Sequence, residues 1–467
     1  MPQIAASGVR AQLVQFLLDG GKNRRGESVG EGDLEQQLNE RGIQTLHVGQ
    51  FDYASVFRER RLGRDQFGEW ARDARFANTL SKWDGADSLF APGPHLTETV
   101  AIDATSLRTF PHEPAAGLII ADFSGASKDL MPRQVLKAQL ARASALGLEV
   151  RAAFEFEMIF VEETAASLRE GGYGRLRPFA PDNKCWSGQT AAQEAAFVAG
   201  LEKAIRSYDI ALFAVGGELG PGCFEATLAA ADGLRSADDA GFFRQATRAY
   251  ARDAGLTASF MPSMGENFPG LGGHLSLSLI ERKSGRNLFA SADGRTSVEA
   301  RSFIAGMMQV VPGAFALCAH TVNAYRRFAP GTWAPKSLTW AEWTFTTAVR
   351  SVPSSGEGAR LEFRLPGADC NPHLTLALML AAGLDGLENS LDVPEAEPNR
   401  EPNDVPPGAQ RFPQDLASAA HALRSSPNAR RLFGERFVDH FATACEVEHA
   451  SLARAVSQSE TKRYLEG

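Results

Sequence analysis

The segment FEFEMIF, residues 154–160, places two carboxylates in what otherwise looks like a buried β-strand. Side chains alternate between the two faces of a strand, so Glu155 and Glu157 share one face and the apolar residues share the other. Two like charges side by side raise each other's pKa unless cations compensate them. The segment therefore predicts a sheet whose apolar face packs against the protein core. Cations must balance the negative charge on its other face.

Three other segments repeat this division between a polar and an apolar face. In HLSLSLIE (274–281), leucines alternate with polar residues, and RLEFRLP (360–366) has the same pattern. In GELGPGCFE (217–225), two glutamates flank a tight Gly-Pro-Gly turn. The polar residues of these segments are His274, Ser276, Ser278, Arg360, Glu362, Arg364, Glu218 and Glu225.

If these faces line one cavity, its ionisable groups indicate metal-dependent phosphoryl transfer. Adjacent carboxylates cannot all stay ionised alone, whereas two divalent cations nearly balance their charge. Oxygen-rich ligation favours Mg²⁺ or Mn²⁺ over zinc, and arginines suit phosphate and carboxylate groups. Taken alone, each pattern is more often a solvated face with surface ion pairs, and only the combination favours a metal site. The candidate ligands are Glu155, Glu157, Glu218, Glu225, Glu362 and His274, and the candidate arginines are Arg327, Arg350, Arg360 and Arg364.

Charge and composition argue against several classes of partner. The 467 residues carry a net charge of −8 at pH 7, which favours neither nucleic acid nor an anionic membrane. No apolar run approaches the roughly 20 residues of a membrane span, and residues 1–21 suggest a short amphipathic helix rather than a signal peptide. The five cysteines are scattered and lack CxxC spacing, which argues against disulfides and zinc. We therefore expect a cytoplasmic protein.

The order of predicted elements indicates two domains. The Pro-rich segment TFPHEPAAG precedes the predicted strand GLIIADF, so we expect domains over residues 1–115 and 116–467. Apolar periodicity predicts helices over residues 65–80, 131–148, 193–209, 238–255, 298–328 and 371–391. Alternation and turn residues predict strands within 43–52, 99–107, 117–123, 149–160, 211–228, 274–281 and 359–366.

The order of these segments resembles the glutamine synthetase family. FEFEMIF resembles the E-x-E strand of that family, and GELGPGCFEAT resembles its E-V-A-P-G-Q-x-E hairpin. FMPSMGENFPGLGGHLSLSL and NAYRRFAPGTWAP are similar to its histidine-containing strand and its flap. RLEFRLPGADCNPHLTLALMLAAGLDGLEN is similar to its R-I-E-x-R-x-P signature and the helix that follows. The resemblance runs from about Gly85 to the C-terminus, and several motifs in one order make it specific.

The resemblance implies a fold, a chemistry and an assembly. We expect an α+β protein with a small β-grasp-like N-terminal domain and a catalytic domain with a curved antiparallel sheet. The family uses ATP to phosphorylate the γ-carboxylate of glutamate, and an amine then attacks the acyl phosphate and expels phosphate. The implied partners are glutamate, ATP and an amine, with two or three Mg²⁺ or Mn²⁺ ions. The implied assembly is a homo-oligomer, a dodecamer of two hexameric rings with each active site at a subunit boundary.

The family's motifs also assign a role to each candidate residue. One metal ion is expected on Glu157, Glu218 and Glu225, and the other, next to the transferred phosphate, on Glu155, His274 and Glu362. Glutamate is expected on Arg327, Arg364 and the backbone of Gly270, and ATP on Ser278, Arg350 and Arg360. Catalytic roles are implied for Arg350, on the phosphates, and for Asp84, which corresponds to an aspartate that serves ammonium.

Several positions depart from the family pattern. The second histidine of its H-x-H motif is Ser276. The flap glutamate that binds and deprotonates ammonium corresponds to Trp333, a tyrosine near that site to Trp186, and a phosphate-binding arginine to Phe345. An ammonium site needs carboxylates, whereas aromatic rings suit a bulky hydrophobic or aromatic amine. We therefore predict a ligase that makes γ-glutamylamides from amines such as anilines or branched alkylamines.

Two other interpretations stay open. One is a glutamine synthetase that uses ammonia, against which the missing flap carboxylate argues. The other is a non-catalytic paralogue, favoured by the loss of the arginine at Phe345 and opposed by the presence of all six candidate metal ligands. A purely packing role for Trp333 is a further alternative. No tyrosine lies between Tyr325 and Tyr464, so we expect no control by adenylylation of a tyrosine in the C-terminal domain.

Overall fold

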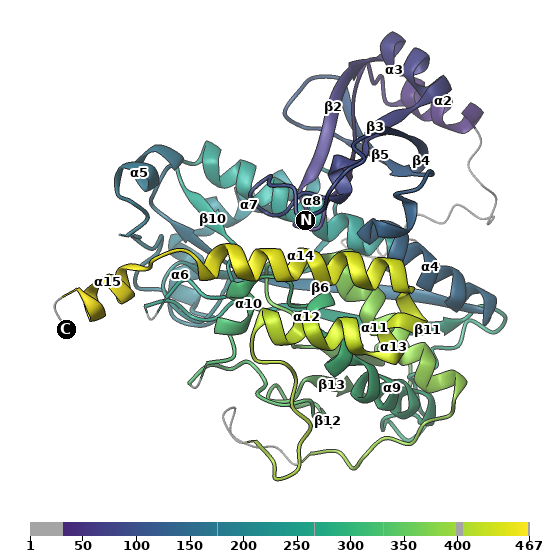
Figure 1. Ribbon diagram of the computed structural model, residues 1–467, viewed down its shortest axis with the longest axis vertical. Helices are drawn as coiled ribbons and strands as arrows, with labels where there is room; N and C mark the ends of the chain where they lie inside the picture. The colour runs from purple at the N-terminus through teal and green to yellow at the C-terminus, as the bar shows by residue number, and fades with distance from the viewer. Residues whose placement is uncertain (1–30, 175, 266, 330, 398–404, 466–467) are drawn as a thin grey trace, which may run out of the picture.

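The computed structural model describes residues 31–465, except for positions 175, 266, 330 and 398–404. The helix predicted over residues 1–21 lies outside the described residues. The chain forms two sheets, a smaller one near the N-terminus and a larger one below it in Figure 1.

The N-terminal sheet has five strands in the order β2-β1-β5-β4-β3. β1 and β5 run parallel at its centre, and the other pairs are antiparallel, which agrees with the predicted β-grasp-like domain. Buried residues such as Val48, Ile119 and Phe123 form its core. The elements are α2 (Glu31–Glu40), β1 (Thr45–Phe51), β2 (Phe57–Gly63), α3 (Arg64–Trp70), β3 (Arg75–Ala77), β4 (Thr97–Thr109) and β5 (Ala116–Phe123).

The predicted domain boundary after residue 115 falls inside this sheet. Strand β5 lies between β1 and β4, and Thr109 pairs with Gly117. The Pro-rich segment is therefore the connection of a hairpin rather than a linker between domains. We propose that the N-terminal domain extends to Phe123.

The helix predicted over residues 65–80 is wrong beyond Trp70. A 3₁₀ turn (Ala71–Asp73) follows α3, and β3 then pairs with β4. Phe76 of β3 is buried in the core of the N-terminal domain. Burial of this ring and pairing with a distant strand outweigh the local helical preference of the segment.

The larger sheet follows the order β12-β13-β14-β11-β6-β8-β7, and β9 and β10 also pair with β6. All of its pairs are antiparallel except β12 with β13. Its strands are β6 (Leu148–Val161), β7 (Leu212–Gly217), β8 (Cys223–Leu228), β9 (Ala231–Asp232), β10 (Thr257–Ser259), β11 (Gly273–Glu281), β12 (Trp340–Glu342), β13 (Val349–Val352) and β14 (Arg360–Phe363).

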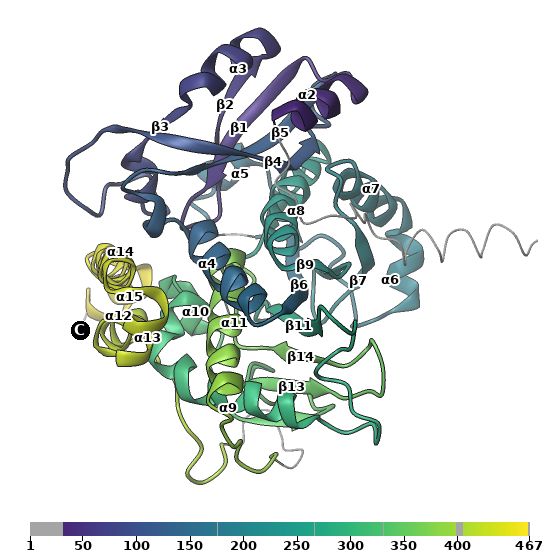
Figure 2. The ribbon, with the colours of Figure 1, turned by 90° about the vertical axis from the view of Figure 1, so that its right-hand side faces the viewer.

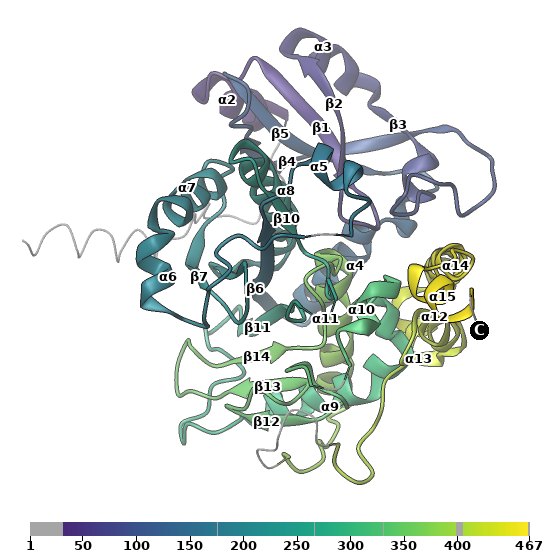
Figure 3. The same ribbon diagram turned by 90° about the vertical axis from the view of Figure 1, so that its left-hand side faces the viewer.

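Helices cover one face of this sheet, as the views in Figures 2 and 3 show. Phe154, Phe156 and Met158 of β6 are fully buried, and α4 and α8 pack against this strand. The predicted alternation is confirmed, because the glutamates between these residues lie on the opposite face. The helices are α4 (Pro132–Ala145), α5 (Ala165–Glu170), α6 (Gly188–Gln193), α7 (Ala195–Arg206), α8 (Gly233–Asp253), α9 (Val298–Ala314), α10 (Val322–Arg326), α11 (Pro372–Glu388), α12 (Leu416–Ser425), α13 (Pro427–Phe433), α14 (Glu435–Ala453) and α15 (Gln458–Tyr464).

The single helix predicted over residues 298–328 is also wrong. Helix α9 ends at Ala314, a 3₁₀ turn covers Phe315–Leu317, and α10 begins at Val322. Thr321 has an extended backbone and its side chain caps α10, which explains the break. Contrary to the expectation from sequence, the stretch Val298–Leu317 is long and apolar enough to cross a membrane, but most of its residues are buried inside the protein. It therefore has the character of a core helix.

Candidate active site

Strand β6 lies at the centre of the polar face, and its two glutamates face different neighbours. Glu155 pairs with His274 of β11, whereas Glu157 pairs with Glu225 of β8. On the far side of β11, strand β14 contributes Glu362. The strand registers thus bring residues from distant parts of the chain onto one face of the sheet. Figure 2 shows strands β6, β11 and β14 of this sheet.

Glu155, His274 and Glu362 form a group that fits a metal ion. One ligand atom from each side chain lies within 4.8 Å of the others. His274 Nδ1 lies 3.1 Å from a carboxylate oxygen of Glu155 and 3.8 Å from one of Glu362. Burial raises the pKa of Glu155, but the hydrogen bond and charge of His274 outweigh it and lower that pKa to about 2. Charged carboxylates beside an imidazole suit a divalent cation such as Mg²⁺ or Mn²⁺.

The second predicted ligand set is less compact. Among the residues that the structure describes, no group of three ligands that includes Glu157, Glu218 or Glu225 comes as close together as the first. Burial, followed by the charges of nearby carboxylates, raises the pKa of Glu225 to about 9. This agrees with the expectation that the clustered carboxylates cannot all ionise without compensation. Divalent cations would supply that compensation.

Glu218 is held at the end of strand β7 by several donors. Its carboxylate accepts hydrogen bonds from Leu219 N at 2.8 Å, Trp186 Nε1 at 3.1 Å and Cys185 Sγ at 3.2 Å. Trp186, which the loose match to the family placed near the amine site, therefore contacts a predicted metal ligand. Sequence reasoning assigned no role to Cys185.

Two arginines contact Glu362 and connect the metal group to a cationic region. Arg350 donates to one oxygen of Glu362 at 3.0 Å, and Arg364 donates to the other. Burial raises the pKa of Glu362, but Arg364 and His274 lower it overall. The guanidinium carbons of Arg350 and Arg364 lie 4.2 and 5.5 Å from the centroid of the Phe345 ring. The aromatic ring at the position of the family's phosphate-binding arginine thus contacts both remaining arginines.

Arg327 lies next to the metal group, but its guanidinium faces the backbone. It donates to Leu365 O at 3.1 Å and to Arg364 O at 3.3 Å, and it lies 3.4 Å from His274 Nε2. Burial lowers its pKa to about 10. Gly270 is adjacent, since a Cβ there would lie 3.3 Å from the Arg327 side chain. Arg327 therefore lies beside Gly270 and the backbone of Arg364, the other two residues predicted to bind glutamate, and that role stays a prediction.

Ser278 and Arg360, which are also predicted to bind ATP, lie farther along strands β11 and β14. Ser278 Oγ donates to Ala359 O at 2.8 Å. Arg360 is exposed and donates to Gly358 O at 3.2 Å. Both positions lie away from the metal group, toward the other end of β11 and the start of β14. Their role in binding ATP stays a prediction.

The three predicted amine-binding rings do not contact one another in the described part of the chain. Trp333, Trp186 and Phe345 are 59%, 79% and 50% exposed. Trp343, which sequence reasoning missed, is also exposed and lies two residues before Phe345. The aromatic pocket thus stays a prediction, although its rings are available to a ligand or to another subunit.

Asp84 lies apart from the carboxylate group of its own chain. Its carboxylate accepts hydrogen bonds from Ala86 N at 2.8 Å and Ser88 N at 2.9 Å within one loop. Its charge acts on Glu448 of α14 and raises the pKa of that residue together with burial, which contributes more. Within one protomer, therefore, this loop faces the C-terminal helices rather than the polar face of the sheet.

Two contacts at the site escaped the sequence reasoning. Gly272 N donates to Glu157 at 2.6 Å, and a Cβ at this glycine would lie 2.5 Å from His274 Nε2. Thr227 Oγ1 donates to Glu155 at 3.1 Å. The glycine pair before His274 was the available signal, because glycine often marks a close backbone approach. No local signal identifies Thr227, since its contact depends on the pairing of β6 with β8.

Comparisons with known proteins agree with this geometry. The family profile described as "Glutamine synthetase, catalytic domain" matches residues 129–464, so the chain belongs to the glutamine synthetase family. It is 29% identical over 444 residues to the glutamate–isopropylamine ligase of a Pseudomonas species. The aligned region covers 92% of this chain and 96% of that protein. It is 32% identical over 351 residues to the glutamine synthetase of Halobacterium salinarum, and this alignment covers 72% of this chain and 74% of that protein.

A solved structure described as "Apo GmaS without ligand" shares the fold. It aligns with a TM-score of 0.80 at 25% identity and covers 94% of this chain and all of the other. The predicted family and α+β fold are confirmed, and the chain is an ATP-dependent ligase. Its relatives include amine ligases and glutamine synthetases, so the family alone does not define the amine.

Proposed function

We propose that this chain joins the γ-carboxylate of glutamate to a bulky hydrophobic amine at the expense of ATP. The observation that carries the proposal is the exposed indole of Trp333 at the flap position where the family has a glutamate. An indole offers apolar surface that a substituted amine can bury and ammonium cannot, so it favours a substituted amine over ammonium. The similarity to a glutamate–isopropylamine ligase supports a branched alkylamine.

In the first step, the γ-carboxylate of glutamate attacks the γ-phosphorus of ATP and releases ADP. Glu155, His274 and Glu362 would hold one divalent cation, and Glu157, Glu218 and Glu225 would hold the other. When bound, these cations offset the charge of the clustered carboxylates and of the transferred phosphoryl group. Arg350 and Arg364, both anchored on Glu362, would neutralise the phosphate and the α-carboxylate.

In the second step, the nitrogen lone pair of the amine attacks the γ-carbonyl carbon. The bond from this carbon to the phosphate oxygen breaks, phosphate leaves, and the amine proton passes to solvent. Aniline is already neutral at pH 7, whereas an alkylamine must first lose a proton. That proton passes to solvent, because Glu218, the carboxylate that Trp186 contacts, would be occupied as a metal ligand.

The position of Asp84 and one exposed apolar side chain support the proposed assembly. We propose a cytoplasmic homo-oligomer, a dodecamer of two hexameric rings, in which Asp84 of one subunit reaches the site of its neighbour. Phe213 on the sheet-edge strand β7 is 80% exposed, and such a ring suits burial against a second copy. Mixed oligomers of Asp84→Asn and Glu362→Ala subunits should then regain activity that neither variant has alone. No recovery on mixing would contradict a shared site.

The amine itself is tested by phosphate release from Mg·ATP and glutamate, measured with ammonium, methylamine, isopropylamine, putrescine and aniline in turn. Product mass is checked in each reaction, and Glu362→Ala serves as the inactive control. We expect kcat/KM with isopropylamine or aniline to exceed that with ammonium by about tenfold or more. Ammonium as the best substrate would return the chain to glutamine synthesis. No turnover with any amine would favour a different acid substrate or a non-catalytic paralogue.

A further inference from the structure

The flap that carries Trp333 is followed by a lysine to which the family resemblance assigns no role. Lys336 comes three residues after Trp333, and its side chain turns back onto the flap. Its ammonium donates to Ala329 O at 2.6 Å and to Thr332 Oγ1 at 2.5 Å. Both acceptors precede Trp333 in the chain, so one side chain links the residues on either side of the indole.

Thr332 extends this contact to Arg327. The hydroxyl of Thr332 donates to Arg327 O at 2.8 Å and lies 3.0 Å from Ala329 O. A hydroxyl has one proton to donate and two lone pairs that accept, so it can bind Lys336 and Arg327 at the same time. The guanidinium of Arg327 lies 3.4 Å from His274 Nε2. The lysine is thus connected through one hydroxyl to the backbone of an arginine beside the metal group.

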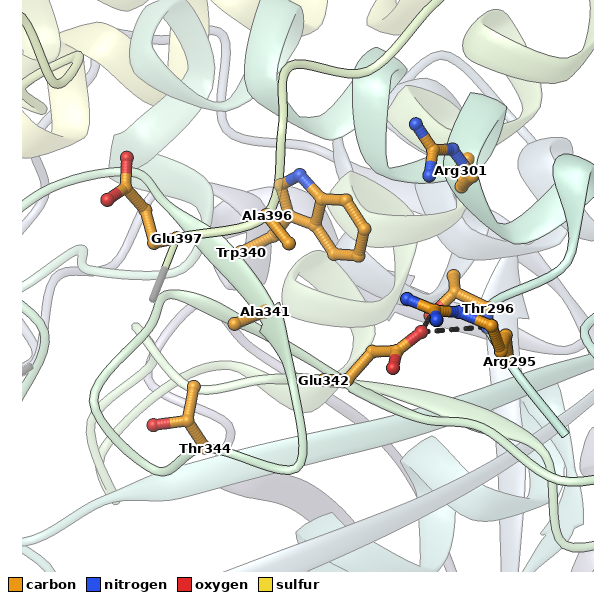
Figure 4. Close-up of a pocket in the computed structure, with 9 residues that line it drawn as sticks. All are labelled: Arg295, Thr296, Arg301, Trp340, Ala341, Glu342, Thr344, Ala396 and Glu397. Carbon is orange, nitrogen blue, oxygen red and sulfur yellow. Dashed lines mark hydrogen bonds between the residues drawn. The ribbon is translucent and has the colours of Figure 1, made fainter. Parts of the chain in front are cut away.

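The chain beyond Lys336 provides a fixed base for this contact. Leu338 N donates to Gln410 O at 2.8 Å, and strand β12 then pairs with β13. Glu342, at the end of β12, accepts from Thr296 N at 2.9 Å and from Thr296 Oγ1 at 2.7 Å, as the dashed lines in Figure 4 show. Lys336 therefore attaches the flap to a segment that is itself anchored.

The ammonium of Lys336 is charged at pH 7 although it is half-buried. Burial, and after it the charge of Arg327, lowers the pKa of Lys336 to about 8. Among the residues that the structure describes, no carboxylate oxygen lies within 4.0 Å of this ammonium, so its acceptors are the two oxygens of the flap. Hydrogen bonds from a charged donor are stronger than neutral ones. Removal of the ammonium should therefore loosen the flap around Trp333.

We infer that Lys336 is a positioning residue that determines which amine the ligase prefers. It holds the flap in the arrangement in which the indole of Trp333 faces the amine, and it acts through Trp333 rather than on the substrates. Without this contact the indole moves away, and the advantage of a bulky amine over ammonium declines. The effect on the amine rests on the proposed function, whereas the hold on the flap rests on the hydrogen bonds of Lys336 alone.

The test compares Lys336→Met with Lys336→Arg, which keeps the charge and the donors. In Lys336→Met, the ratio of kcat/KM for isopropylamine to that for ammonium should fall by about threefold or more, because the proposed preference itself is about tenfold. The loss should appear in the KM for isopropylamine, with the KM for ATP unchanged, and Lys336→Arg should keep most of the wild-type ratio. Lys137→Met is the matched control, since Lys137 lies on α4 and contacts Asp122 at 3.2 Å. An unchanged ratio in Lys336→Met, or an equal fall in Lys137→Met, would overturn the assignment.

Thr332 offers an independent test of the same contact. Thr332→Val removes the hydroxyl at nearly constant shape and should lower the ratio as Lys336→Met does, whereas Thr332→Ser keeps the hydroxyl and should not. In the double variant of Lys336→Met and Thr332→Val, the two falls should not multiply, because both changes break one network. Falls that multiply would show that the two residues act independently and would contradict the shared contact.

Hydrogen–deuterium exchange separates a failure of this contact from a failure of the proposed function. The backbone amides of residues 331–336 should exchange faster in Lys336→Met and Thr332→Val than in the wild type, whichever amine is the substrate. Equal exchange in Lys336→Met and the wild type would overturn the hold on the flap. Faster exchange in a protein that prefers ammonium would keep that hold and contradict the role in amine choice together with the proposed function. Thermal melts of each variant verify that it is folded.

Discussion

The ring of Phe345 lies 4.2 Å from the guanidinium of Arg350, which in turn donates to the predicted metal ligand Glu362 at 3.0 Å. At the position where the family has a second arginine, this chain has the neutral ring of Phe345, which packs against Arg350. In the proposed site fewer cations would face the phosphates, and the ring contacts the two arginines that remain.

The first prediction concerns this support. In Phe345→Ala, Arg350 loses a contact of about 0.5–2 kcal/mol, so kcat/KM for ATP should fall by about two- to thirtyfold. Phe345→Tyr keeps the ring and should stay near the wild type. Steady-state kinetics at varied ATP measure both variants. An alanine variant with unchanged kinetics would show that the ring does not position Arg350.

The second prediction concerns the glycine behind His274. A methyl group at Gly272 would lie 2.5 Å from His274 Nε2 and 3.0 Å from the Arg327 guanidinium, so Gly272→Ala must displace one of them. We expect kcat to fall by at least about tenfold, because misplaced groups at a reacting centre lose catalysis steeply. Gly356→Ala is the control, since no atom lies within 4 Å of its added Cβ. Equal activity of the two variants would contradict the close approach.

The third prediction concerns the flap. Trp333→Glu restores the carboxylate that the family uses for ammonium and removes an exposed apolar surface. The ratio of kcat/KM for isopropylamine to that for ammonium should fall by about tenfold or more. Trp343→Glu adds the same charge to another exposed tryptophan and serves as the control. A ratio that does not move in Trp333→Glu would mean that this residue only packs.

The fourth prediction concerns acid stability. Burial, and to a lesser extent Arg244, lowers the pKa of His320 to about 4, and its Nδ1 has no hydrogen-bond partner among the described residues. Because the folded pKa is depressed, stability is fully present above pH 6.5 and is lost as the pH falls toward 4. As the pH falls, the unfolded chain takes up this proton before the folded chain does. The free energy of unfolding is therefore lower by about 2 kcal/mol at pH 5. His320→Gln has no imidazole to protonate. Its free energy of unfolding, measured with urea, should therefore differ less between pH 7 and pH 5 than that of the wild type. An equal pH dependence would place His320 in a solvated position.

The faces of the strands could be predicted because alternation is a local property. Leu275 and Leu277 are buried while His274 and Glu155 meet on the other side, as the alternating letters require. The family motifs likewise located Glu362 and Arg364 beside each other. Local pattern and motif order were therefore sufficient to predict that Glu155, His274 and Glu362 lie together, while their role as metal ligands stays a prediction.

Features that depend on distant partners could not be predicted. Strand β5 joins the N-terminal sheet only because β1 and β4 flank it. The contact of Trp186 with Glu218 depends on how the loop before α6 folds back on β7. Such contacts are fixed by tertiary packing, which a single sequence does not display.

The measurement that tests the central claim most directly is a competition in one reaction. Equal concentrations of ammonium and isopropylamine compete for limiting glutamate and Mg·ATP, and mass spectrometry measures the product ratio. This ratio equals the ratio of the two kcat/KM values. The proposed function predicts γ-glutamylisopropylamide in about tenfold excess or more. Glutamine as the main product would contradict it.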